Sequence, residues 1–285
     1  MPYTLGSVPY VNAIPLTSPF AADDSPVKVL FDVPSRLPAL LESGEADAIL
    51  VSSVDALRVP GRRMAVGVCI GTDGPVKSVR LFSKVPFNQI ESLALDAASM
   101  TSNRLARILL DELYSVRPAI LTLEPDLENM LDQADACVLI GDIGMTSSGS
   151  ELHVMDMGEA WTHLTGKPFV WAAWIGGGHL TPELAGYLQT PLEYYGAHSR
   201  AAVIAGSRTE EPTIDARRQQ AVEQGITHSG WTRDMVQDYY ENVMVYTMDE
   251  RMLEGYREFQ TRLLKHGFDD CGHFPALVAP AFPLA

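Results

Sequence analysis

The chain has 285 residues, of which 46% are hydrophobic and 20% charged, a composition typical of a globular protein with a large core. It carries 21 lysines and arginines against 36 aspartates and glutamates, so its formal net charge is −15. This acidity disfavours nucleic acid and anionic membranes as partners, because both attract basic patches. The 3 cysteines are widely spaced, which predicts no disulfide framework and fits a reducing compartment.

The N-terminus shows no basic region followed by an apolar stretch, so it does not read as a signal peptide. No apolar run approaches the roughly 20 residues that span a bilayer. We therefore expect a cytoplasmic protein without a membrane partner. The sequence leaves the oligomeric state open, a homodimer included.

The first segment with a distinctive pattern covers residues 5–16. It predicts a short strand that breaks at Pro9 and continues into a polar turn. Asn12 is expected to cap a short helix, and Pro15 fits only the first turn of one. A strand that ends in a capped helix directs backbone N–H groups and one amide side chain into the same volume. That arrangement suits an anionic ligand.

A strand–helix–strand unit follows over residues 27–51, with Ser35 as the expected helix cap and Gly44 closing the helix. So short a unit implies a parallel pair of strands. Ligands bind such sheets at the carboxyl ends of the strands. Asn12 and the pair Ser52 and Ser53 fall at such ends.

The pattern restarts after two further strands, at residues 65–70 and 76–83. A second α/β unit is predicted from alternating strands and helices, which cover residues 92–96, 101–113, 119–123, 127–133 and 136–140. Later strands are expected at 152–155 and 169–174.

The last third of the chain is predicted to be mostly helical from residue 181 to 266, with a loop at 209–212. Residues 270–285 are expected to form a tail that is packed on the surface or frayed. The spacing of Tyr239, Tyr240 and Tyr246 with nearby aliphatic residues predicts packing in the core.

Two α/β units followed by late helices predict an α/β protein with two lobes around a cleft. We assign residues 1–90 and 175–285 to the first lobe and residues 91–174 to the second. The strand at 169–174 would return the chain to the first lobe.

Hydroxyl side chains at strand ends are the first candidate ligand contacts. Thr101 and Ser102 stand at a predicted helix start, where free N–H groups and the positive helix end favour an anion. Plain capping by Ser99 or Thr101 accounts for the same pattern and is common. Ser52 and Ser53 are open to both interpretations, as a ligand contact or as an ordinary turn.

Ser78 or Ser83 could add another hydroxyl to the cleft. Their odd spacing along a strand directs one of them toward the core side, and the sequence does not decide which. Asp96 and Asp142 follow strands and could act as acids or bases. Aspartates in such positions more often cap the next turn.

Other catalytic patterns are absent from the sequence. The glycine run before His179 lacks the Gly-Lys-Ser/Thr end of a phosphate-binding loop, and no G-x-S-x-G segment occurs. Cys271 and His273, together with His266, are too few for a convincing metal site. The residues alone therefore predict an anion-binding cleft with no metal and no evident catalytic group.

Several blocks also resemble, in the same order, the chorismate dehydratases of the futalosine route to menaquinone. The blocks are Gly6–Leu16, Val33–Leu37, Gly44–Asp47, Ser78–Ser83, Asp96–Ser102, Leu139–Asp142 and, as the most specific, Asp156–Trp174. The resemblance covers about residues 5–175, and beyond them only a general helical pattern is similar.

This resemblance implies a two-lobed fold like that of the type 2 periplasmic binding proteins, with a ligand cleft between the lobes. It implies a cofactor-free loss of water from chorismate, a dicarboxylate, to give 3-[(1-carboxyvinyl)oxy]benzoate. In the family the substrate's own enolpyruvyl carboxylate is thought to act as the base.

The resemblance also assigns roles to the candidate residues. Asn12 would be the catalytic side chain, orienting the departing hydroxyl or the enolpyruvyl group. The remaining candidates would bind the substrate, and they are Ser52, Ser53, Thr101, Ser102, Ser78 or Ser83, and Asp142.

Two alternatives stay open. The chain could be a non-catalytic binder of small carboxylates, although secreted receptors of that kind need an export signal. It could also resemble the sister 1,4-dihydroxy-6-naphthoate synthases. Those enzymes have a histidine-based pair where this chain has Gly141 and Asp142, and their N-terminal motif differs.

Overall fold

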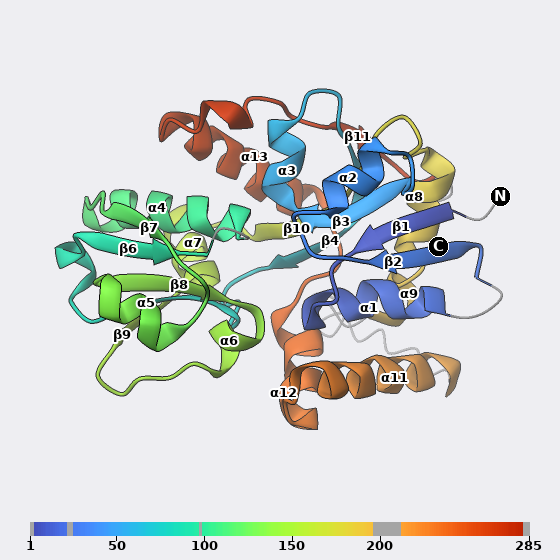
Figure 1. Cartoon of the computed structure of the whole chain (residues 1–285). Coiled ribbons are helices and arrows are strands. Elements are labelled where there is room, and N and C mark those ends of the chain that lie inside the picture. The colour runs from blue at the N-terminus through green and yellow to red at the C-terminus, as the bar shows by residue number, and fades with distance from the viewer. Residues whose placement is uncertain (1–2, 22–24, 97–98, 196–211, 282–285) are drawn as a thin grey trace.

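The computed structural model describes residues 3–21, 25–96, 99–195 and 212–281. The described chain forms two sheets, each covered by helices, which lie side by side in Figure 1. The strand orders are β11-β4-β10-β3-β1-β2 and β7-β6-β8-β5-β9. The two-lobed α/β architecture expected from the sequence is therefore present.

The first sheet has six strands, and the N-terminal strand β1 lies inside it, between β3 and the edge strand β2. Its strands are β1 (Tyr3–Ser7), β2 (Val27–Phe31), β3 (Ala48–Ser52), β4 (Arg63–Thr72), β10 (Phe169–Gly176) and β11 (Ala276–Val278). Strand β1 pairs in parallel with both β2 and β3, so the predicted strand–helix–strand unit is parallel with β1 between its strands. Strand β10 runs antiparallel to β3 and β4.

The second sheet consists of β5 (Val79–Ser83), β6 (Ser92–Leu95), β7 (Ala119–Thr122), β8 (Ala136–Ile140) and β9 (His153–Asp156). Its two faces bury different side chains, since successive residues of a strand point to opposite faces. Leu81 packs into the main core, whereas Phe82 packs into a smaller cluster with Met130 of helix α5 (Leu127–Gln133).

The sheets divide the chain at other points than the predicted lobe boundaries of residues 90 and 174. Strand β5 belongs to the second sheet, because it pairs with β8 and β9, and β10 belongs to the first. The chain therefore crosses between the sheets after Thr72 and returns before Phe169. Each of these strands joins its sheet by pairing with antiparallel strands far away in the sequence. The local residue pattern of a strand does not reveal such partners.

Helices cover both sheets (Figure 1). Around the first sheet lie α1 (Ile14–Thr17), α2 (Leu37–Glu42), α3 (Ser53–Arg58), α8 (Pro182–Gln189), α9 (Leu192–Tyr195) and α11 (Pro212–Ser229). The second sheet carries α4 (Met100–Tyr114), α6 (Gly141–Thr146) and α7 (Met157–Thr165) in addition to α5. After α12 (Arg233–Asp238) a π-helical turn, Tyr239–Val243, precedes the long helix α13 (Glu250–Lys265).

Two sequence-based expectations for the C-terminal third need comment. The predicted loop at residues 209–212 lies outside the described residues apart from Pro212, which begins α11. The predicted surface tail is wrong for Ala276–Val278, because these residues add a parallel strand beside β4. Three residues are too short a run to show strand periodicity.

Local signals at helix ends were only partly informative. Pro15 lies in the first turn of α1 as expected, and Gly44 follows α2 with a φ of 77°. Asn12 caps no helix; it lies within the 3-10 turn Val11–Ala13. The cap of α2 is Arg36, so the expected role of Ser35 is also wrong. The carboxamide of Asn12 is consequently not used by the backbone of α1.

One hydrophobic core runs through both lobes. It joins Leu5 and Ile49 of the first sheet to Leu81 and Leu105 of the second lobe, all fully buried. In the described part of the chain, no helix combines the length and the apolar character that crossing a membrane requires.

Candidate functional site

A cavity of about 340 Å³ lies between the two lobes. Its lining comes from the segments that follow β1, β3, β6 and β8, together with the crossing between β4 and β5. Its polar side chains include Asn12, Ser52, Ser78, Asp96, Ser99, Thr101, Ser102 and Asp142. Most of the sequence-predicted candidates are therefore brought together, at the carboxyl ends of strands.

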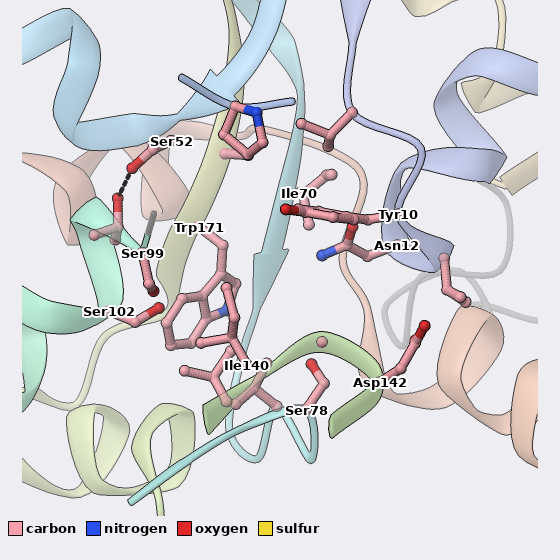
Figure 2. A pocket seen from close by; sticks show the side chains of 18 of the residues that line it. Tyr10, Asn12, Ser52, Ile70, Ser78, Ser99, Ser102, Ile140, Asp142 and Trp171 are labelled. Carbon is pink, nitrogen blue, oxygen red and sulfur yellow. Dashed lines mark hydrogen bonds between the residues drawn. The ribbon is translucent and has the colours of Figure 1, made fainter. Parts of the chain in front are cut away.

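Asn12 lies at the first-lobe wall of this cavity. The 3-10 turn holds it just after β1, and Figure 2 shows its amide nitrogen pointing into the cavity beneath the ring of Tyr10. Its Oδ1 atom is buried without a hydrogen-bond partner in the described structure. A buried acceptor without a donor is costly, and a ligand that donates a hydrogen bond would remove that cost.

The hydroxyl groups of Ser52 and Thr101 join the two lobes. Ser52 ends β3 of the first sheet, Thr101 lies in the first turn of α4, and their side-chain oxygens are hydrogen-bonded (Figure 2). The Thr101 hydroxyl also accepts from the backbone N–H of Val54 at 3.4 Å. The pair therefore lies where a ligand held by both lobes would meet hydroxyl donors.

Ser53, by contrast, does not line the cavity. Its side chain is fully buried and donates to the carbonyl oxygen of Val170 at 2.7 Å. Its own carbonyl oxygen accepts from the hydroxyl of Tyr256 at 2.8 Å. Ser53 connects β3 to its neighbours, so its expected role in ligand binding is wrong.

The N-terminus of α4 opens onto the cavity. The capping residue Ser99 makes no side-chain capping bond, and Ser99, Thr101 and Ser102 are all buried while lining the cavity. The first N–H groups of this 15-residue helix have no partner within the helix, and its dipole makes that end positive. Side-chain capping of α4 by Ser99 is therefore not observed. The free N–H groups and hydroxyls at this helix start are arranged as the anion-binding interpretation expects.

The ambiguity between Ser78 and Ser83 is resolved. Ser78 lines the cavity, is 2% exposed, and its Oγ lies 2.7 Å from the phenolic oxygen of Tyr239. Ser83 lies at the far end of β5, where it donates to the carbonyl oxygen of Val85 at 2.7 Å. Ser83 therefore holds a turn and has no access to the cavity.

Asp142 lies in the first turn of α6, below Asn12 in Figure 2. Burial raises the pKa of Asp142, and the nearby His228 acts in the opposite direction. Burial and the carboxylates of Asp96 and Asp142 likewise raise the pKa of Tyr10. Among the described residues, no lysine, arginine or histidine lines the cavity. The site therefore offers neutral hydrogen-bonding groups and two aspartates.

Sequence reasoning missed several residues of the lining. Trp171 forms part of the wall, with its indole N–H donating to the Thr72 hydroxyl at 3.1 Å. Trp231 and Tyr239 reach the cavity from the C-terminal third. The spacing of Tyr239 with aliphatic residues predicted core packing, and no local signal distinguishes a core tyrosine from one whose hydroxyl meets a cavity.

Metal-binding groups are not evident in the part of the chain that the structure describes. No cluster of three or more histidine, cysteine, aspartate or glutamate side chains occurs there that could hold a metal ion. Cys271 is buried and free, as are Cys69 and Cys137. Burial raises the pKa of the Cys271 thiol to about 11.

Comparison with known proteins agrees with this architecture. Residues 3–265 match a protein family described as menaquinone biosynthesis. The chain belongs to this family. It is also 31% identical to the chorismate dehydratase of Thermus thermophilus over 194 residues, which are 61% of this chain and 69% of that protein.

Solved structures show the fold of this family member. A protein from Archaeoglobus fulgidus is similar with a TM-score of 0.66 at 14% identity, over 93% of this chain and 97% of its own. The periplasmic aliphatic sulphonate binding protein SsuA from Escherichia coli is similar with a TM-score of 0.57 at 13% identity, over 93% of this chain and 92% of its own. The expected periplasmic-binding-protein-like fold is confirmed, and such a fold suits a small ligand between the lobes.

Proposed function

We propose that this protein is a chorismate dehydratase, which removes water from chorismate to give 3-[(1-carboxyvinyl)oxy]benzoate in menaquinone biosynthesis. Membership of the menaquinone biosynthesis family and the dehydratase relative support the proposal. The observation that carries it is the cleft itself. Neutral donors from both lobes converge there beside one carboxamide, and no basic side chain of the described chain lines it.

The two carboxylates of chorismate need two separate sets of donors. We assign the ring carboxylate to the start of α4, where Ser52, Thr101 and Ser102 lie with the free N–H groups of the helix. We assign the enolpyruvyl group to the side of Asn12 and Ser78. Backbone and hydroxyl donors aimed at the ring carboxylate stabilise the charge that develops on it, without reorganising during the reaction.

The elimination breaks one ring C–H bond and one ring C–O bond. The electrons of the C–H bond form the new ring double bond, and the leaving hydroxide takes up the abstracted ring proton to become water. Aromatisation of the ring drives the step. We assign proton abstraction to the enolpyruvyl carboxylate of the substrate, because the lining offers no histidine or lysine. An internal base gains chiefly from fixed geometry, which a narrow cleft supplies.

Incubation of the purified protein with chorismate tests this proposal. We expect an aromatic product, followed by ultraviolet absorbance and liquid chromatography. Chorismate that is bound but unchanged would favour a non-catalytic binder, to which the fold likeness to SsuA also points. Turnover of a dehypoxanthine futalosine-type substrate, with chorismate inert, would favour the sister synthase.

Asn12→Ala tests the role of the carboxamide. We expect turnover to fall about 100-fold, which is typical for the loss of one well-placed hydrogen-bonding group in an active site. Circular dichroism should stay unchanged, because Asn12 makes no structural cap. Ser83→Ala is the matched control, because its hydroxyl faces a turn, and it should keep full turnover. An Asn12→Ala variant with near-full activity would contradict the assigned role.

A further inference from the structure

Tyr239, in the C-terminal third of the chain, is one of the polar residues that line the cleft. It is 2% exposed, it lines the cavity, and its phenolic oxygen lies 2.7 Å from the Oγ of Ser78. Ser78 belongs to the crossing between the sheets, whereas Tyr239 follows α12. The contact therefore joins two segments that are 161 residues apart in the chain.

The position of Tyr239 is fixed from several sides. Its ring packs edge-on against Trp231, with centroids 5.3 Å apart and planes at 86°. It begins the π-helical turn, which the N–H of Met244 closes by donating to the Tyr239 carbonyl oxygen at 2.9 Å. The next residue, Val245, exchanges two backbone hydrogen bonds with Gly71 of β4, at 2.8 and 2.9 Å. Such π turns are rare and occur often at functional sites.

The phenol of Tyr239 stays protonated at physiological pH. Burial raises its pKa strongly, while hydrogen bonding with Ser78 and Asn12 acts in the opposite direction. It therefore has one hydrogen to donate and an oxygen that can accept. A phenol is a stronger acid than an alcohol, so the Tyr239 hydroxyl is the better donor of this pair. Either oxygen can donate across the 2.7 Å contact, and with Tyr239 as the donor, Ser78 accepts and keeps its own hydroxyl hydrogen for another acceptor.

We propose that Tyr239 is a positioning residue for the reaction in the cleft, because its hydroxyl orients that of Ser78 toward a carboxylate of the substrate. The inference rests on the proposed function and assigns the C-terminal third a part in it. Without the Tyr239 hydroxyl, the Ser78 side chain can rotate and donate to its own backbone. A chain of two hydroxyl groups also polarises the outer one, which strengthens its bond to an anion.

Tyr239→Phe tests the proposal, because it removes the hydroxyl and keeps the ring. We expect kcat with chorismate to fall about 10-fold or more and KM to rise only several-fold, since misorientation costs rate more than binding. The melting temperature should change by only a few degrees. Tyr240→Phe is the matched control: Tyr240 lies in the same turn, and its hydroxyl has no hydrogen-bond partner in the described structure. That variant should turn over chorismate like the wild type.

A double-mutant cycle with Ser78→Ala separates positioning from a structural role. If Tyr239 acts through Ser78, adding Tyr239→Phe to Ser78→Ala should cause little further loss. If the losses of kcat in the two single variants multiply fully in the double variant, or if Tyr239→Phe keeps its kcat, the proposal is overturned.

Ser78→Ala alone should lose kcat to the same extent as Tyr239→Phe. This variant keeps the test valid if Tyr239→Phe fails to fold, and unchanged turnover in Ser78→Ala would also overturn the proposal.

Failure of the proposed function is distinguishable from failure of this inference. If the wild-type protein does not convert chorismate, the dissociation constant of a benzoate-type dicarboxylate is the readout instead. Trp171 and Trp231 line the cavity, so ligand binding can be followed by tryptophan fluorescence. We then expect Tyr239→Phe to weaken binding several-fold and Tyr240→Phe to leave it unchanged. Equal dissociation constants for the wild type and Tyr239→Phe would overturn the orienting role by itself.

Discussion

Asp142 brings a carboxyl group into a cleft that otherwise offers neutral hydrogen-bonding groups and one further aspartate, Asp96. It follows the end of β8 and lies in the first turn of α6. Burial raises the pKa of Asp142, so its proton is lost at a higher pH than that of an exposed aspartate. Once ionised, it repels a dianionic ligand across the cleft.

This arrangement predicts a pH dependence of ligand binding. As the pH rises through the raised pKa of Asp142, the side chain becomes charged and dicarboxylate binding should weaken. Asp142→Asn stays neutral, so its dissociation constant should vary less over the same range. Titration of a benzoate-type dicarboxylate from about pH 4.5 to 8 checks this, and identical pH profiles for both proteins would contradict it.

The serines show how far single residues could be predicted from the sequence. Their positions after strands indicated the correct edge of each sheet, and Ser52 and Ser78 do line the cavity. Ser53 and Ser83 were equally plausible from their spacing. They are excluded by backbone acceptors that come from other parts of the fold, the carbonyl oxygens of Val170 and Val85. Side-chain direction depends on these tertiary partners, which local sequence does not specify.

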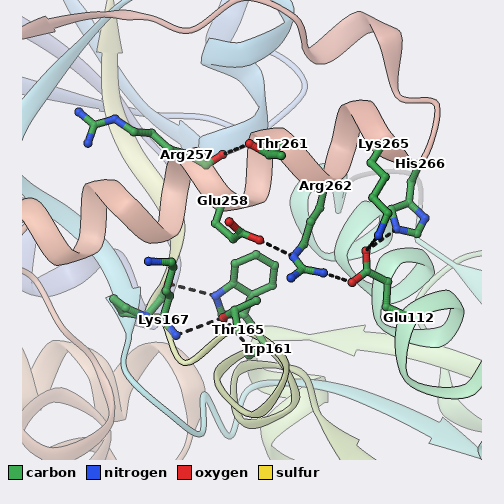
Figure 3. A network of polar contacts seen from close by, with 11 residues as sticks. Glu112, Trp161, Thr165, Lys167, Arg257, Glu258, Thr261, Arg262, Lys265 and His266 are labelled. Carbon is green, nitrogen blue, oxygen red and sulfur yellow. Dashed lines mark hydrogen bonds and ion pairs between the residues drawn. The ribbon is translucent and has the colours of Figure 1, made fainter.

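Helices α4 and α13 are joined by a charged cluster on the outer side of α4 (Figure 3). Glu112 of α4 forms an ion pair with Arg262, and its Oε1 lies 2.8 Å from Nε2 of His266 and 3.1 Å from Nζ of Lys265. Its side chain is only 12% exposed. The three basic residues lie at the C-terminal end of α13, where the helix dipole also favours positive charge.

Glu112→Ala should therefore destabilise the protein more than most surface substitutions. It leaves the largely buried Arg262 with Glu258 as its remaining carboxylate partner, and the loss of a charge-assisted contact of this kind costs about 1.5–3 kcal/mol of unfolding free energy. The exposed pair of Glu223 and Arg233 is the matched control. Glu223→Ala should cost less than about 1 kcal/mol. Denaturant titration of both variants checks the difference, and equal losses would show that the cluster contributes no more than a surface pair.

At the level of elements, the sequence predicted whether a segment is a helix or a strand better than it predicted which strands pair with one another. The strands and helices of both α/β units lie close to their expected places, because their apolar periodicity is strong. The assignment of β5 and β10 to the wrong lobes has another origin, since sheet membership follows from long-range pairing. The π-helical turn at Tyr239 also lacked a signal, because one extra residue in a turn leaves the helical pattern nearly unchanged.

The whole molecule should unfold in one transition despite its two sheets. Its main hydrophobic core contains side chains of both lobes, including Ile49 of β3 and Leu105 of α4, so neither lobe can lose its packing alone. A ligand that binds only the folded cleft should raise the melting temperature of that single transition. At a free concentration 100 times its dissociation constant, the ligand adds about 2.7 kcal/mol to the free energy of unfolding. Calorimetry with and without a benzoate-type dicarboxylate checks both statements, and two separate transitions would contradict the first.

The two crossings of the chain have a consequence for how such proteins can be altered. The whole second sheet is inserted between β4 and β10, which are hydrogen-bonded neighbours, and Phe169 pairs directly with Thr72. The inserted segment thus starts and finishes at nearly the same place, as grafted domains do. Replacing it with the corresponding segment of a relative would give a chimaera with a new wall facing Asn12. The ion pairs of Glu112 with α13, of Arg104 with Asp270 and of Lys167 with Glu254 are further junctions that such an exchange must also match.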